Sequence, residues 1–160
     1  MNLILLESNE LLPDGRVALQ GARAEHLRTV LKVDTGSRVR VGLVDGPRGT
    51  AIVSSIDASG VSLACTLDTD PPVRPRVDLL LALPRPKVLK RLWAQLAAIG
   101  VGRIMLTNAA RVERNYFDTH VLTPALYRPL LMEGLQQARD TRVPIVSVHR
   151  QLKVLVEDEL

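Results

Sequence analysis

The sequence predicts an α/β protein, α+β overall, in which a small β-barrel over residues 1–70 is followed by an α/β domain with a parallel sheet over residues 77–160. Three observations predict this class. Residues 1–70 contain short, alternating or β-branched segments that turn residues separate. Residues 71–76 are rich in proline. After them, long apolar strands alternate with amphipathic helices.

The first part is expected to combine short strands with a single helix. The helix is predicted over residues 22–33, because Ala24, Leu27, Val30 and Leu31 fall on one face. Cys65 is the only cysteine of the chain and is interpreted as a buried strand thiol. The expected strands lie at residues 16–21, 38–44, 49–57 and 60–68.

Residues 71–76 are predicted to be a linker, since prolines cannot donate to a strand ladder and they stiffen the chain. Strands and helices that alternate after the linker imply a parallel sheet with right-handed crossovers. A three-stranded parallel sheet usually needs more strands and helices to cover both of its faces, so the second domain looks incomplete. The expected elements are strands at 77–83, within 100–108 and at 143–149, helices from Pro86 and within 123–139, and a possible helix start at 151–160.

Charge and composition narrow the class of protein. The net charge is +4, with seven Lys/Arg against nine Asp/Glu in residues 1–70 and fourteen against eight in residues 71–160. The basic second part suggests an anionic partner, although many basic proteins bind none. A lone cysteine and no Cys/His cluster of metal-ligand spacing predict a cytoplasmic protein without a metal. No signal peptide and no membrane span are expected.

Basic side chains follow the first strand of the second domain. Arg85, Lys87, Lys90 and Arg91 lie at the start of a helix, where positive charge is unfavourable. A bound phosphate would offset that cost and would meet the free N–H groups of the helix. Because the loop prolines lack N–H groups, side chains must hold any such anion. The alternative is a solvated basic helix face.

Two other loops and the barrel helix supply further cations. Residues 108–117 carry Arg111 and Arg114 beside two aromatic residues, a combination that suits RNA. The alternative interpretation, with equal weight, is that the two aromatic rings belong to the hydrophobic core. Residues 136–144 carry Arg142, which is predicted to bind RNA. The alternative is that this side chain is only a favourable cation near a helix C-terminus. The three loops are expected to gather where the strands end. Residues 1–70 contain no aromatic residue, so Arg28 and Lys32 are expected to contact RNA shape and backbone rather than stack on bases.

Three segments, taken in order, resemble blocks of the RsmE family, bacterial methyltransferases that modify N3 of a uridine in 16S ribosomal RNA. They are "HLRTVLKVDTGSRVRVGLVDG" (26–46), "LALPRPKVLKRLWAQLAAIGVGRIMLTNAARV" (81–112) and "MEGLQQARDTRVP" (132–144). The resemblance implies a PUA-like RNA-binding barrel over residues 1–70 and the N-terminal part of a SPOUT domain over residues 77–160. It also implies S-adenosylmethionine as the cofactor of the intact family member, and a homodimer.

Carried over by position, the resemblance matches Lys87, Arg111, Gln137 and Arg142 to basic or polar positions of the family. The family's glycine-rich loop and knotted segment do not occur in these 160 residues, so we expect a C-terminally truncated chain that binds no cofactor and is inactive alone. The expected partner is 16S rRNA or the small ribosomal subunit. A non-catalytic RNA-binding module and a scaffold for an acidic protein are the alternatives.

No catalytic base stands out in the sequence, and the catalytic residue is left unassigned. The residues predicted to bind RNA are Arg28, Lys32, Arg85, Lys87, Lys90, Arg91, Arg111, Arg114, Gln137 and Arg142.

Overall fold

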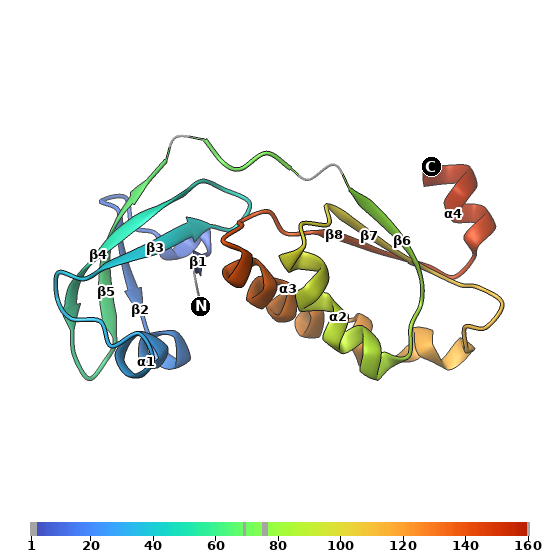
Figure 1. Ribbon diagram of the computed structural model, residues 1–160, viewed down its shortest axis with the longest axis horizontal. Helices are drawn as coiled ribbons and strands as arrows, with labels where there is room; N and C mark the ends of the chain where they lie inside the picture. Colours follow the sequence, from blue (N-terminus) through green and yellow to red (C-terminus); the bar gives the residue numbers. More distant parts are fainter. Residues whose placement is uncertain (1–2, 69, 75–76, 160) are drawn as a thin grey trace. The chain divides into compact units, whose positions relative to one another are not determined.

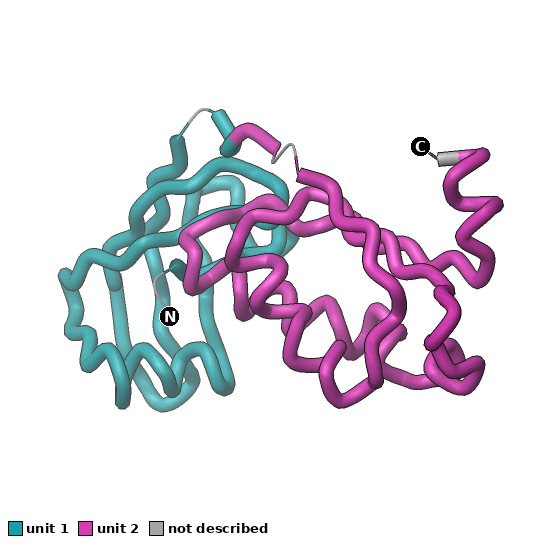
Figure 2. Tube along the Cα trace, turned by 45° about the vertical axis from the view of Figure 1, so that its right-hand side comes forward, with its two compact units in different colours: residues 1–72 teal, residues 73–160 magenta. Residues whose placement is uncertain are grey.

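A computed structural model describes residues 3–68, 70–74 and 77–159. The chain divides into two compact units, Met1–Pro72 and Val73–Leu160, which Figure 2 colours separately. This division falls inside the predicted linker at 71–76, of which Pro75 and Arg76 lie outside the described residues. Each unit has its own sheet, so each is described by itself.

The first unit is built on a five-stranded sheet with the order β1-β3-β4-β5-β2 (Figure 1). β1 pairs parallel with β3, and the other neighbours are antiparallel. The sheet is curled, and alternate side chains such as Val17, Leu19, Val53 and Leu63 form its core. Its elements are β1 (Ile4–Leu6), η1 (Ser8–Glu10), β2 (Arg16–Leu19), α1 (Gly21–Thr29), β3 (Arg38–Leu43), β4 (Arg48–Ile56) and β5 (Val61–Leu67).

α1 is shorter than the predicted helix over residues 22–33. It ends at Thr29, and the N–H groups of both Val30 and Leu31 donate to the carbonyl of His26. Lys32 then adopts the left-handed conformation, with φ of +49°. The expected apolar face is therefore wrong at its C-terminal end, where Val30 is 62% and Leu31 41% exposed. The chain leaves the helix here because it must turn toward β3.

Two contacts tie the start of the first unit to α1. Arg23 of α1 forms an ion pair with Glu10 and donates to the carbonyl of Leu5. This guanidinium holds the pKa of the Glu10 carboxyl below its usual range. Cys65 lies in β5, as predicted, and is half-buried, and burial raises the pKa of its thiol.

The second unit has the predicted alternation of strands and helices. Its sheet is parallel with the order β6-β7-β8, in a register that aligns Ala82, Thr107 and His149. The central strand β7 is buried, whereas Leu80 and Ile145 of the outer strands are exposed. The elements are β6 (Asp78–Ala82), α2 (Pro86–Ala98), β7 (Arg103–Thr107), η2 (Arg114–Asp118), η3 (His120–Leu122), α3 (Pro124–Ala138), β8 (Ile145–His149) and α4 (Leu152–Glu159).

The two long helices of this unit pack directly on each other. A Cβ built on Gly134 of α3 would lie 2.0 Å from the carbonyl oxygen of Ala94 in α2, so the backbones meet at that point. Trp93 is fully buried, its indole N–H donates to the carbonyl of Val121 (3.3 Å), and its ring lies 5.0 Å from that of Tyr127. α2 is thereby held at a fixed position. Among the described helices, none is long and apolar enough to cross a membrane.

Candidate nucleic-acid interface

The three strands of the second unit end at the same edge of their sheet. Ala82, Thr107 and His149 are register partners, and neighbouring strands lie about 4.8 Å apart. The N–H of Leu83 donates to the carbonyl of Thr107 (2.8 Å), which ties the loop after β6 to the end of β7. Figure 1 shows the loops after β6 and β7 leaving this end together. Ligands bind at such carboxyl ends in parallel sheets.

The loops at this end are cationic. We define the basic edge as Arg85 and Lys87 after β6 together with Arg111 and Arg114 after β7. All four side chains are exposed, and none has an ion pair or side-chain hydrogen bond within the described residues. Exposed, unpaired cations at the ends of neighbouring strands fit an extended anion such as a nucleic-acid backbone.

Arg85 is the N-cap residue of α2, and its side chain makes no capping hydrogen bond. Pro86 occupies the first helical position, and the first turn contains no acidic residue. The helix therefore begins with positive charge and with the N–H of Lys87 uncapped, which costs stability. The cationic first turn predicted from the sequence is therefore present in the fold, without an acidic residue to offset it.

The aromatic residues after β7 are engaged by contacts within the second unit. The Tyr116 hydroxyl donates to Glu113 (3.0 Å), and the guanidinium of Arg150 lies 5.3 Å from the centre of the Phe117 ring. Both rings are half-buried. These contacts favour the core interpretation of the rings over the stacking interpretation.

The structure does not bring Gln137 and Arg142 to the basic edge. Both precede β8, whose first residue Ile145 pairs with Arg103 at the start of β7. In a parallel sheet this places them at the amino edge, opposite the ends of the strands. The expected gathering of three basic loops at one edge is therefore wrong for the third loop. Its RNA-binding role stays a prediction.

The remaining predicted residues fall at three other places. Lys90 and Arg91 line a groove of about 380 Å³ between α2 and α3, together with Gln137 of α3. Arg28 pairs with Glu25 (3.1 Å) and donates to a backbone carbonyl of its own unit, so part of its donor capacity is used internally. Lys32 lies in the turn that follows α1.

A buried hydroxyl at the end of β7, beside the basic edge, is not among the predicted site residues. Thr107 is 3% exposed, and its Oγ1 has no hydrogen-bond partner among the described residues. The signal was a hydroxyl residue at the end of an otherwise apolar strand, "RIMLT". Nearby, Nε2 of His149 lies 2.9 Å from the Ser147 hydroxyl. An orphaned buried hydroxyl marks a place where another polar group is expected.

Replacing Arg85 by aspartate is expected to stabilise the second unit and weaken anion binding together. An aspartate cap can accept a hydrogen bond from the N–H of Lys87 and suits the helix dipole, for a gain of about 1 kcal/mol. For a unit of this size the melting temperature rises by about 4–8 °C. Thermal unfolding followed by the fluorescence of the single tryptophan, Trp93, measures it. Arg85→Ala should lose the anion contact without the gain, and an unchanged or lower melting temperature for Arg85→Asp contradicts this account.

Comparison with known families decides the class of protein. Residues 71–159 match the family described as the RNA methyltransferase domain. The chain belongs to this family. The predicted family resemblance is thereby confirmed, and the matched range contains the whole basic edge.

Two curated relatives match almost the whole chain. Ribosomal RNA small subunit methyltransferase E of Treponema pallidum is 26% identical over 155 residues, 96% of this chain and 58% of that protein. Ribosomal RNA small subunit methyltransferase E 1 of Borreliella burgdorferi is 24% identical over 153 residues, 96% of this chain and 63% of that protein. This chain therefore spans about three fifths of the length of these relatives.

Solved structures share the fold. A probable rRNA-methyltransferase from Porphyromonas gingivalis superposes with a TM-score of 0.71 at 17% identity, covering 98% of this chain and 64% of its own. A ribosomal RNA small subunit methyltransferase E from Neisseria gonorrhoeae, bound to S-adenosyl methionine, gives 0.69 at 19% identity, covering 93% and 61%. The predicted combination of a barrel-like sheet and a parallel α/β sheet is confirmed.

The described residues at the basic edge do not fit S-adenosylmethionine on their own. That cofactor carries a positively charged sulfonium, whereas the free charged side chains here are Arg85, Lys87, Arg111 and Arg114. The carboxylates after β7 are already engaged: Glu113 accepts the hydrogen bond of Tyr116, and Asp118 pairs with Arg150. Like charges repel, so this edge is suited to phosphate and not to a sulfonium.

Proposed function

We propose that this chain contributes the RNA-binding part of an S-adenosylmethionine-dependent methyltransferase that acts on N3 of a uridine in 16S rRNA. The observation that carries the proposal is a match to the RNA methyltransferase domain that includes an exposed, unpaired cluster of cations at the ends of neighbouring strands. The names of the two curated relatives support small-subunit rRNA as the substrate. A cytoplasmic homodimer is part of the same proposal.

The proposal assigns a role to each part of the chain. Residues 1–70 are a PUA-like barrel that holds RNA, residues 71–76 are a linker, and residues 77–160 are part of a SPOUT domain. Arg85, Lys87 and Arg111 bind backbone phosphates and so fix the position of the strand that carries the target uridine. Bound S-adenosylmethionine supplies the methyl group of the reaction, and this chain's own residues bind and orient the RNA.

The RNA-binding role is tested with a triple variant, Arg85→Ala, Lys87→Ala and Arg111→Ala. We expect affinity for a hairpin RNA with an unpaired uridine loop to fall at least about tenfold, and the slope of log affinity against log salt to flatten by about two to three units. Each lost phosphate contact no longer releases a counterion. Fluorescence anisotropy over a salt series measures both.

The matched control removes the same charge elsewhere, with Arg16→Ala, Arg48→Ala and Arg103→Ala. Arg16 and Arg103 are paired with Asp14 and Asp78, and all three arginines lie outside the basic edge. The control therefore lowers the net charge by as much as the test variant and leaves the basic edge intact. Equal losses in both triple variants contradict a specific interface.

The uridine specificity is tested separately by disrupting the gene and analysing the nucleosides of 16S rRNA by mass spectrometry, where 3-methyluridine is expected to disappear. Unchanged 3-methyluridine with intact RNA binding favours the non-catalytic RNA-binding module.

A further inference from the structure

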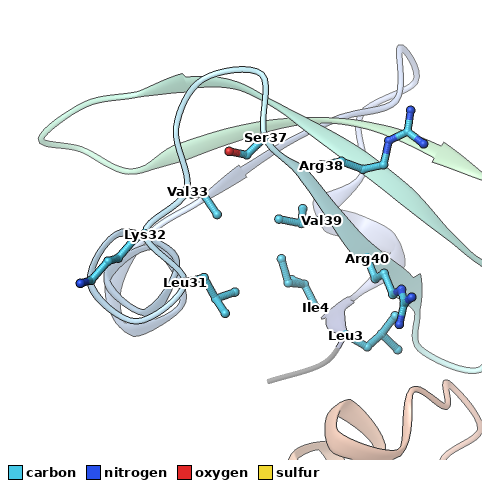
Figure 3. Close-up of a pocket in the computed structure, with 9 residues that line it drawn as sticks. All are labelled: Leu3, Ile4, Leu31, Lys32, Val33, Ser37, Arg38, Val39 and Arg40. Atoms are coloured by element: carbon cyan, nitrogen blue, oxygen red, sulfur yellow. The ribbon is translucent and has the colours of Figure 1, made fainter.

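The first unit contains a hollow of about 390 Å³ that is separate from the basic edge (Figure 3). It lies between the turn that follows α1 and the strands β1 and β3. Figure 3 shows the side chains of Ile4, Leu31, Val33 and Val39 pointing toward one another across it. Its volume falls within the range of small-molecule sites, roughly 300–1,000 Å³.

The wall of the hollow combines aliphatic side chains with polar ones and is partly open to solvent. Ile4 at its base is buried, whereas Leu31 at its rim is 41% exposed. The single hydroxyl in the wall belongs to Ser37, whose Oγ accepts a hydrogen bond from the N–H of Asp34 (2.9 Å). The hydroxyl proton of Ser37 can therefore be donated to a bound group.

Cations flank the hollow on two sides. Lys32 lies on the side of α1, and Arg38 and Arg40 lie on the side of β3, all extending outward from the aliphatic wall (Figure 3). All three are exposed, and within the part of the chain that the structure describes none has a side-chain partner. A partly apolar depression between unpaired positive charges is complementary to a ligand with an apolar face and negative charge on either side.

The backbone around the hollow is held by hydrogen bonds on each side. The N–H of Gly36 donates to Val53 (2.8 Å), and the N–H of Val53 donates to the carbonyl of Ser37 (2.9 Å). The N–H of Val33 donates to the carbonyl of Leu27 (3.1 Å). Between these hydrogen bonds, Lys32 has a left-handed backbone conformation. This conformation has a steric cost for every residue with a Cβ and none for glycine. A preformed site of this kind needs little ordering on binding.

We propose that this hollow binds one unpaired nucleotide of an RNA strand. The base lies against Leu31, Val33 and Val39, and the phosphates on its two sides bind Lys32 and the pair Arg38 and Arg40. Proteins recognise single-stranded RNA through bases that are splayed out of the stack, and each nucleotide of a strand is flanked by phosphates. The inference rests on the proposed function, because family membership favours RNA over an acidic peptide.

The first test is by NMR of the 160-residue chain with labelled methyl groups. Adding the single-stranded RNA U10 is expected to shift the methyl signals of Leu31, Val33 and Val39, and annealing the strand to A10 is expected to remove most of this effect. Linear polyphosphate, which has charge but no base, is expected to leave these methyl signals in place. Equal shifts with polyphosphate, or no shifts with bound U10, overturn the inference.

Variants provide the second test. Lys32→Gly relieves the left-handed backbone, so it should keep or raise the melting temperature while U10 affinity falls about tenfold. Arg38→Gln with Arg40→Gln should weaken U10 binding further. Arg16→Gln, at the opposite edge of the sheet, is the matched control and should change little. Undiminished affinity in Lys32→Gly and the Arg38/Arg40 variant overturns the inference.

The outcomes separate this inference from the proposed function. U10 binding that depends on Arg85, Lys87 and Arg111 but leaves the methyl signals of the hollow unmoved overturns the inference alone. Failure of the chain to bind any RNA overturns both. Methyl shifts caused by a deca-glutamate peptide and not by U10 overturn the inference in favour of an acidic protein as the occupant.

Discussion

Replacing Gly134 by alanine is expected to destabilise the second unit by about 3 kcal/mol, near the upper end of overpacking costs. In an ordinary helix the same change gains up to about 1 kcal/mol, because alanine is the better helix former. Here the added methyl group would lie 2.0 Å from the carbonyl oxygen and 2.8 Å from the carbonyl carbon of Ala94. The two helices must move apart to admit it, since backbone atoms cannot rotate away. Urea unfolding followed by Trp93 fluorescence measures the loss.

Two control variants isolate the cause of that loss. Ala94→Gly in the Gly134→Ala background should not restore stability, because the clash is with backbone atoms of Ala94 and not with its side chain. Ala125→Gly, at an exposed position in the first turn of the same helix, should cost at most about 1 kcal/mol through helix propensity. A Gly134→Ala chain as stable as the parent would contradict the close approach of α2 and α3.

Periodicity and turn residues were enough to predict most of the fold. The apolar runs that became β6, β7 and β8 are separated by helices, and that alternation leaves a parallel sheet as the natural arrangement. Pro129 lies inside α3 and does not break it, because the helix gains more from its buried face than one missing hydrogen bond costs. These elements are long and strongly patterned, so local signals decide them.

The elements that local signals missed depend on distant partners. β1 has only three residues, Ile4–Leu6, and it is a strand because β3 lies beside it in parallel. The last turn of the predicted helix over residues 22–33 is apolar but unwinds, because Lys32 turns the chain toward β3. Neither a three-residue parallel pairing nor a left-handed lysine leaves a periodic signal in the sequence.

The candidate site was predictable in part. Arg85, Lys87 and Arg111 follow the ends of parallel strands, so topology alone places them at one edge. The same topology, applied strictly, places Arg142 at the other edge, since it precedes its strand. The hollow of the first unit could not be predicted, because Ile4, Leu31 and Val39 come from three segments that only the folded chain brings together.

Replacing Trp93 by alanine is the change with the largest expected effect on the second unit. The indole is fully buried and in contact with Tyr127, and its removal leaves a cavity and the carbonyl of Val121 without its donor. Large-to-small changes of this kind cost about 3–5 kcal/mol. A native domain is stable by only about 5–15 kcal/mol, so this loss is a large share of the total.

The measurement exploits the distribution of aromatic residues. The chain has one tryptophan, two tyrosines and one phenylalanine, and none of them lies in residues 1–70. Near-ultraviolet circular dichroism therefore reports the second unit alone. Because the variant lacks the only tryptophan, unfolding is followed in the tyrosine band, which should be lost at a lower temperature in Trp93→Ala than in the parent. Trp93→Phe keeps an apolar ring but loses the hydrogen bond, so its cost should be smaller, about 1–3 kcal/mol. If the alanine variant unfolded at the temperature of the parent, Trp93 could not be the side chain that fixes α2 against η3 and α3.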